Sequence, residues 1–76
     1  MTSTERRMSI LKAIAEAGDS GISLAQIHVG LGLSALSNYV HDLVAMQLVE
    51  VVPWHVAKTR ANRYVINEAG RVRLSL

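Results

Sequence analysis

The segment from residue 22 to residue 49 constrains the fold of this 76-residue chain more than any other part. Two stretches with helical spacing of apolar residues flank the turn Leu31-Gly32-Leu33-Ser34, and a β-branched stretch follows the second. Gly32 suits a left-handed turn conformation in which a Cβ would be strained. This order predicts two short helices and then a strand, with the second helix projecting away from the core.

The first of these two helices has a well-defined start. Ser23 and Gln26 have the spacing of a capping box, with Ser23 as the N-cap. Ile22 and Ile27 have the spacing of a hydrophobic staple, in which the two side chains pack together across the cap. We expect this helix to end near Gly30.

The second helix is expected to begin after Ser34, as its N-cap, and to end near residue 46 or 47. Apolar residues at spacings of three and four predict its buried stripe: Leu36, Val40, Leu43 and Val44. The opposite face has small and polar residues: Ala35, Ser37, Asn38, His41, Asp42 and Ala45. Side chains of this size allow close approach to another surface.

Spacing and turn residues predict the remaining elements. A first helix is expected at about residues 4–17, with Thr4 as its N-cap and Gly18 at its end. The later elements are a strand at 49–52, an exposed basic loop at 58–63, a second strand at 64–66, and a helix from Glu68 to about Leu74 capped by Asn67. Pro53 indicates an edge or a strand end. Together they make a single domain, 1–76.

Composition narrows the class of protein. There is no cysteine, which excludes disulfides and thiolate metal sites. The three histidines lack ligand spacing, so neither a metal site nor a cofactor is expected. No nucleophile–base pair, carboxylate pair or Gly-rich phosphate loop is found, so we expect no catalytic residues and no enzyme. No apolar run approaches the ~18 residues of a membrane span, and the first residues do not form a signal peptide, so a cytoplasmic protein is expected.

Charge is distributed unevenly along the chain. The net charge is +2, but residues 51–76 have five basic residues and one acidic residue. Lys58, Arg60 and Arg63 fall at the expected tip of the hairpin. Such a cluster can contact phosphates or place an arginine in the minor groove, and a solvated loop is the alternative.

Three pieces of the chain together support a family resemblance: ISLAQIHVGLGLS, LSALSNYVHDLVAMQLVEVV and RYVINEAGRVRL. In order and spacing they resemble the winged helix-turn-helix DNA-binding domain of small bacterial, archaeal and phage transcriptional regulators, such as the arsenical-resistance and multiple-antibiotic-resistance repressors. The resemblance implies a mainly α fold with a small β-hairpin: a three-helix core, a two-stranded wing and a short C-terminal helix.

This chain departs from the family pattern in several places. Many members have Gly where Met46-Gln47 stands, and many have Arg or Lys on the helix face that here has Asn38, His41 and Asp42. The cysteine metal-sensor site is absent, and no effector domain fits in 76 residues. We therefore expect no small-molecule effector.

The function implied by the resemblance is sequence-specific binding of double-stranded DNA by a transcriptional regulator. The second helix of the motif would enter the major groove, and the wing would contact the backbone. The candidate DNA-binding residues are Ser34, Ala35, Ser37, Asn38, His41, Lys58, Arg60 and Arg63. A homodimer is expected because a single module buries little surface, with the first or last helix at the interface.

Other interpretations remain open. The helix residues named above could be merely solvated, and the mildly acidic helix favours a protein–protein interaction module, such as a small phage or virus protein that binds a host factor. Tyr39 is expected to pack against the preceding helix, with its hydroxyl on a phosphate. Trp54 and Tyr64 are expected in cross-strand or core contacts, or else in dimer or sugar-phosphate contacts. Arg6 and Arg7 are expected to be solvated, with additional phosphate contacts as the alternative.

Overall fold

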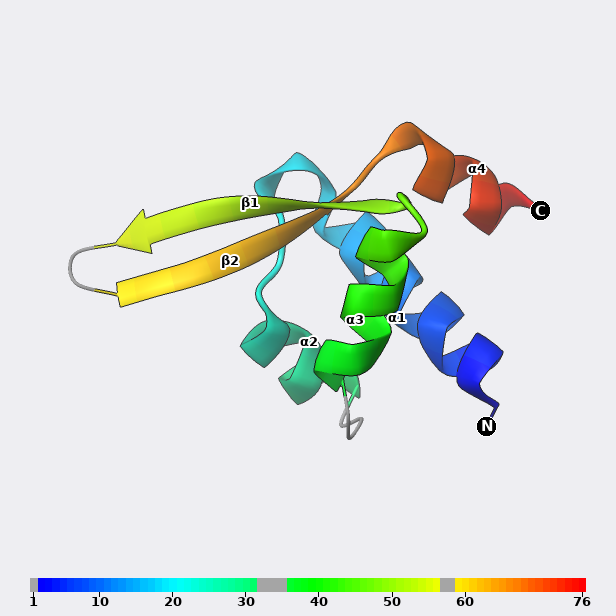
Figure 1. The fold of residues 1–76 in the computed structure, drawn as a ribbon, viewed down its shortest axis with the longest axis horizontal. Coiled ribbons are helices and arrows are strands. Elements are labelled where there is room, and N and C mark those ends of the chain that lie inside the picture. Colours follow the sequence, from blue (N-terminus) through cyan, green and yellow to red (C-terminus); the bar gives the residue numbers. More distant parts are fainter. Residues whose placement is uncertain (1, 32–35, 57–58) are drawn as a thin grey trace.

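The computed structural model describes the backbone of residues 2–31, 36–56 and 59–76, and side chains within 2–30, 36–53 and 62–76. The elements in chain order are α1 (Ser3–Ala17), a 3₁₀ turn (Gly18–Ser20), α2 (Leu24–Leu31), α3 (Leu36–Ala45), β1 (Val49–Val56), β2 (Thr59–Ile66) and α4 (Glu68–Ser75). The described chain is thus mainly helical with one two-stranded antiparallel sheet, as predicted. The hairpin extends well to one side of the helices, and α4 lies toward the opposite side (Figure 1).

Helix α1 begins earlier than predicted. Its N-cap is Thr2, whose hydroxyl accepts from the Glu5 N–H at 3.2 Å, and the Glu5 carboxylate accepts from the Thr2 N–H at 3.5 Å. The prediction that Thr4 caps the helix was wrong. The residue three positions after Thr4 is Arg7, which has no acceptor to return the bond, whereas Thr2 and Glu5 satisfy each other.

Helix α2 has the predicted cap. The Ser23 hydroxyl accepts from the Gln26 N–H at 3.3 Å, and the Gln26 side-chain oxygen accepts from the Ser23 N–H at 3.1 Å. Ile27 is buried and Ile22 is half-buried at the same end of the helix. The turn with Gly32, and Ser34 as the N-cap of the next helix, lie outside the described residues.

Helix α3 ends in a Schellman motif. The Leu48 N–H donates to the Leu43 carbonyl at 3.1 Å, and the Gln47 N–H donates to the Val44 carbonyl at 2.9 Å. The motif requires a left-handed residue, and Gln47 occupies that place with φ of 61°. The helix therefore ends at Ala45, and the corner is made by a residue with a side chain.

Replacing Gln47 with glycine is expected to raise the free energy of unfolding by about 0.5 kcal/mol. The change removes a strain of about 1–2 kcal/mol, which arises because a residue with a Cβ adopts the left-handed conformation. Glycine loses more backbone entropy on folding, and this loss cancels part of the gain. Urea denaturation would measure the gain. Gln47→Ala is the control: it keeps a Cβ, so an equal gain in that variant would contradict the backbone explanation.

The hairpin is longer than predicted. The register pairs Val49 with Ile66 at its base and Val56 with Thr59 at its tip. The predicted strands at 49–52 and 64–66 were too short, and the predicted loop at 58–63 was wrong because residues 59–63 belong to β2. Because the pairing continues from Val49 to Val56, alternate residue pairs along this stretch can exchange backbone hydrogen bonds.

Pro53 is accommodated inside β1 by the register. Tyr64 uses its backbone N–H and carbonyl to pair with Ile22, at 2.8 and 3.1 Å, so its pairing with Val51 is of the non-hydrogen-bonded type. Antiparallel pair types alternate, so the pairing of Pro53 with Asn62 two positions on is of the same type. The missing N–H of proline therefore breaks no bond between the strands.

The core lies between α1, α3 and the base of the hairpin. Its buried residues are Ile10, Leu11, Ile14, Ile27, Leu36, Val40, Leu43, Leu48, Val49, Tyr64 and Ile66. Tyr64 thus makes the predicted core contact, and Val44 of the predicted stripe is half-buried. Val51 and Val52 are about two-fifths exposed, which shows that the hairpin leaves the core at this point.

Helix α4 is joined to the corner between α3 and β1 by Asn67. As predicted, Asn67 caps the helix: its side-chain oxygen accepts from the Gly70 N–H at 2.8 Å. Its amide group donates to the Gln47 carbonyl at 2.6 Å, and its own N–H donates to the Leu48 carbonyl at 3.2 Å. None of the helices in the described residues has the length and apolar character needed to cross a membrane.

Candidate functional site

The outward side of α3 presents three of the predicted site residues. Ser37, Asn38 and His41 are all exposed. Helix α3 lies in front of α1 in Figure 1, and no other labelled element covers its outward side. Within the described part of the chain, no hydrogen bond of these side chains is recorded.

Asp42 lies one helical turn after Asn38 and is paired with an arginine of α1. It was predicted on the exposed face, but it is half-buried, and its Oδ2 lies 3.0 Å from Nε of Arg7 on α1. The ion pair offsets the one negative charge on α3. The face formed by Ser37, Asn38 and His41 is therefore neutral, small and polar, and we call it the α3 face.

Tyr39 joins α3 to α1 through two arginines. Nη1 of Arg6 donates to the Tyr39 hydroxyl at 3.3 Å, and the guanidinium carbon of Arg7 lies 5.9 Å from the centre of the ring. The prediction that both arginines are merely solvated was wrong. The expected packing of Tyr39 against α2, with its hydroxyl on a phosphate, stays a prediction. The bond from Arg6, then one from Ser3, lowers the pKa of Tyr39 below its ordinary value.

Arg63 forms hydrogen bonds within the fold. Its Nη1 donates to the carbonyls of Ser20 and Gly21, both at 3.4 Å, and the residue is half-buried. Gly21 has φ of 75°, and a Cβ there would lie 3.0 Å from Cβ of Arg63. Arg63 therefore holds the base of β2 against the turn after α1, instead of lying in an exposed loop.

The other predicted site residues are not all described. Arg60 lies in β2 opposite His55, with its side chain outside the described set. Ser34, Ala35 and Lys58 lie outside the described residues altogether. Their roles stay predictions.

An open groove separates α2 from the hairpin. It has a volume of about 300 Å³ and is lined by Ser23, Leu24, Ala25, Asn62 and Tyr64. Within the described ranges, no group of three His, Asp or Glu side chains is placed to hold a metal ion. The groove and the α3 face present both hydrogen-bonding and apolar groups.

Arg6 and Arg7 are the neighbours of α3 that sequence reasoning missed. They contact residues 33 and 35 positions away, so no local spacing links them. A weaker pattern could have suggested these contacts. Arg6 and Arg7 are adjacent on one helix, and Tyr39 and Asp42, three residues apart, share a face of another.

The sequence matches no known protein-family model and no curated protein. Inferences about function therefore depend on the fold and on the α3 face.

Proposed function

We propose that this chain is a winged helix-turn-helix domain that binds double-stranded DNA as part of a transcriptional regulator. Helices α2 and α3 follow one another along the chain, and the hairpin that follows them is the proposed wing. An α-helix with its side chains is about 10–12 Å across and fits a major groove about 12 Å wide. Helix α3 is the proposed groove-binding helix.

The observation that supports this function most strongly is the character of the α3 face. A carboxylate facing a groove lined by phosphates would be repelled, and the only acid on α3 is paired with Arg7. Asn38 has the amide group that bonds adenine at N6 and N7, and Ser37 and His41 add further donors and acceptors. The proposed face can therefore approach DNA closely and distinguish bases.

The proposed wing would contact the DNA backbone. The described chain measures 39 Å along its longest axis, and the hairpin lies along that direction (Figure 1). Arg60 belongs to its outer half, and Arg63 holds its base in place. A long hairpin fixed at its base can bring basic residues to phosphates beside the groove.

We propose that the domain acts as a homodimer through α4. Val72 and Leu76 are 56% and 91% exposed on this helix, and Met46 at the nearby corner is 44% exposed. Burying these side chains against a second copy would place two α3 helices on a two-fold symmetric DNA site.

Titration of a fluorescent duplex, followed by anisotropy, tests the proposal. At a salt concentration of about 50 mM we expect the chain to bind random duplex and to lose affinity steeply as salt rises. Selection from a random pool should enrich a two-fold symmetric sequence that binds two chains. Failure to bind at low salt would contradict the DNA proposal and favour the protein-interaction alternative.

Asn38→Ala with His41→Ala is expected to abolish preference for the selected sequence. Each lost base contact should cost about 1–3 kcal/mol of discrimination, since a bidentate pair contributes that much. Binding to random duplex, which depends on backbone charge, should remain. If the double variant keeps full preference, another surface distinguishes the bases.

A further inference from the structure

Arg6 differs from Arg7 in having no acid beside it. Arg7 is paired with Asp42, whereas no carboxylate in the described residues is recorded in an ion pair with Arg6. Its Nε is buried and has no hydrogen-bond partner in the described structure. The pair of arginines thus leaves one uncompensated positive charge on the flank of α3.

The guanidinium of Arg6 is held in place. Its stem is half-buried, and Nη1 is tied to the Tyr39 hydroxyl at 3.3 Å. A side chain that is already held loses less rotamer entropy when it binds a ligand than a freely moving surface arginine does. Such a guanidinium is better suited to bind an anion than a freely moving one is.

Tyr39 supplies a second donor at the same place. Its oxygen accepts from Arg6 and lies beside Ser3, and its own O–H can donate to an incoming acceptor. The lowered pKa of Tyr39 makes that O–H a stronger donor. A guanidinium edge and a hydroxyl side by side match the oxygens of a phosphate group.

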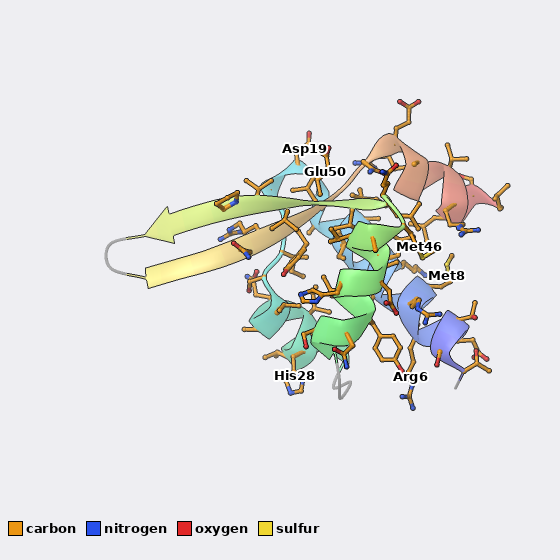
Figure 2. All side chains as sticks on the ribbon, viewed as in Figure 1. Arg6, Met8, Asp19, His28, Met46 and Glu50 are labelled. Carbon is orange, nitrogen blue, oxygen red and sulfur yellow. The ribbon has the colours of Figure 1, made fainter. Side chains whose placement is uncertain are left out.

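This pair lies next to the α3 face. Tyr39 is adjacent in sequence to Asn38, and Figure 2 shows Arg6 at the same end of the molecule as His28 of α2, pointing outward. A strand of DNA running past a helix in its major groove has its phosphates on the flank of that helix. The pair is therefore where a backbone phosphate would pass.

We infer that Arg6 and Tyr39 form a phosphate-binding site for the DNA backbone, on the flank of α3 and separate from the hairpin. The inference rests on the proposed DNA-binding function and adds a residue of α1 to the interface. Arg7 does not belong to the site, because its guanidinium is paired with Asp42.

The test compares Arg6→Ala with Lys12→Ala. Lys12 is an exposed residue further along α1, so both variants lose one positive charge from the same helix. Duplex affinity is measured by anisotropy across a series of salt concentrations. Arg6→Ala should weaken binding several-fold and reduce the slope of log affinity against log salt by about 0.9, the value for one phosphate contact. Lys12→Ala should leave the slope unchanged.

Tyr39→Phe and Arg6→Lys separate the two donors. Tyr39→Phe keeps the ring but frees the arginine, so we expect a smaller loss of affinity with a nearly unchanged slope. Arg6→Lys keeps the charge without the planar edge and should bind between wild type and Arg6→Ala. It also provides the comparison if thermal melting shows that Arg6→Ala is unfolded.

Two results would overturn the inference in different ways. If the wild type binds duplex and Arg6→Ala binds with the same slope, the site is absent but the DNA-binding function stands. Equal losses in Arg6→Ala and Lys12→Ala would mean that only overall charge matters, which also overturns the site. If the wild type does not bind duplex at low salt, the proposed function and the site both fail.

Discussion

Replacing Gly70 with alanine is expected to lower the free energy of unfolding by about 2 kcal/mol, as extra methyl groups do in well-packed places. A Cβ at this position would collide with the carbonyl oxygen of Leu48 and would lie 2.6 Å from Cγ1 of Ile66. The first contact is with backbone and cannot be relieved by a change of rotamer. Helix α4 would have to move away from the corner between α3 and β1.

Gly30→Ala is the matched control for this substitution. Gly30 lies in α2, and a Cβ added there would meet no described residue within 4 Å apart from its two chain neighbours and the backbone of its own helix. Alanine in a helix is favoured over glycine, so this variant should gain about 0.5–1 kcal/mol. Urea denaturation of both variants would show directly whether the free energy of unfolding falls in one and rises in the other. A loss in both variants, or in neither, would contradict close packing at Gly70 as the cause.

The result at Gly70 also concerns the α3 face. Asn67 joins α4 to the carbonyl of Gln47, just after the end of α3. If α4 moves, the corner that fixes the direction of α3 loses this bond. We therefore expect Gly70→Ala to weaken any binding that depends on a fixed α3 more than it weakens binding through the hairpin.

The sequence was sufficient to predict those features of the structure that depend only on residues close together in the chain. The capping box at Ser23 and Gln26 and the cap at Asn67 are both confirmed, because each needs only residues three positions apart. Gly70 gave no such indication. A glycine inside a helix ordinarily destabilises the helix. Here the close approach of the Leu48 carbonyl explains why a residue without a Cβ is needed.

The hairpin and the site were harder to predict because their contacts are distant in sequence. Polar and basic residues at 58–63 predicted a loop, but pairing with β1 makes residues 59–63 part of β2. Arg63 has the composition of a phosphate contact, and yet it bonds to the backbone of Gly21. Whether an arginine faces solvent or another segment depends on the tertiary fold, which spacing along the chain does not encode.

Asp42→Asn is expected to tighten binding to random duplex. The substitution keeps the size of the side chain, removes a negative charge from the flank of α3, and frees Arg7 from its partner at 3.0 Å. If Arg7 then contacts one phosphate, the slope of log affinity against log salt steepens by about 0.9, and the loss of affinity between 50 and 200 mM salt grows roughly 3.5-fold.

The cost to stability should be small. The two side chains are 34% and 49% exposed, and ion pairs at such positions contribute about 0–1 kcal/mol. Glu68→Gln on α4 is the control, since it removes the same charge from an exposed site away from α3. Equal affinity in both variants would show that Asp42 does not lie near DNA phosphates.

The same ion pair explains why an acid is tolerated on a helix that is proposed to enter a groove. An unpaired Arg7 would bind any phosphate and so would favour all sequences equally, whereas Asn38 and His41 can distinguish bases. By pairing with Arg7, Asp42 limits the part of the binding affinity that does not depend on the DNA sequence. Asp42→Asn should therefore raise affinity for random duplex more than for the selected site, and the ratio of the two affinities should fall. A rise in that ratio would contradict a DNA-facing role for Asp42.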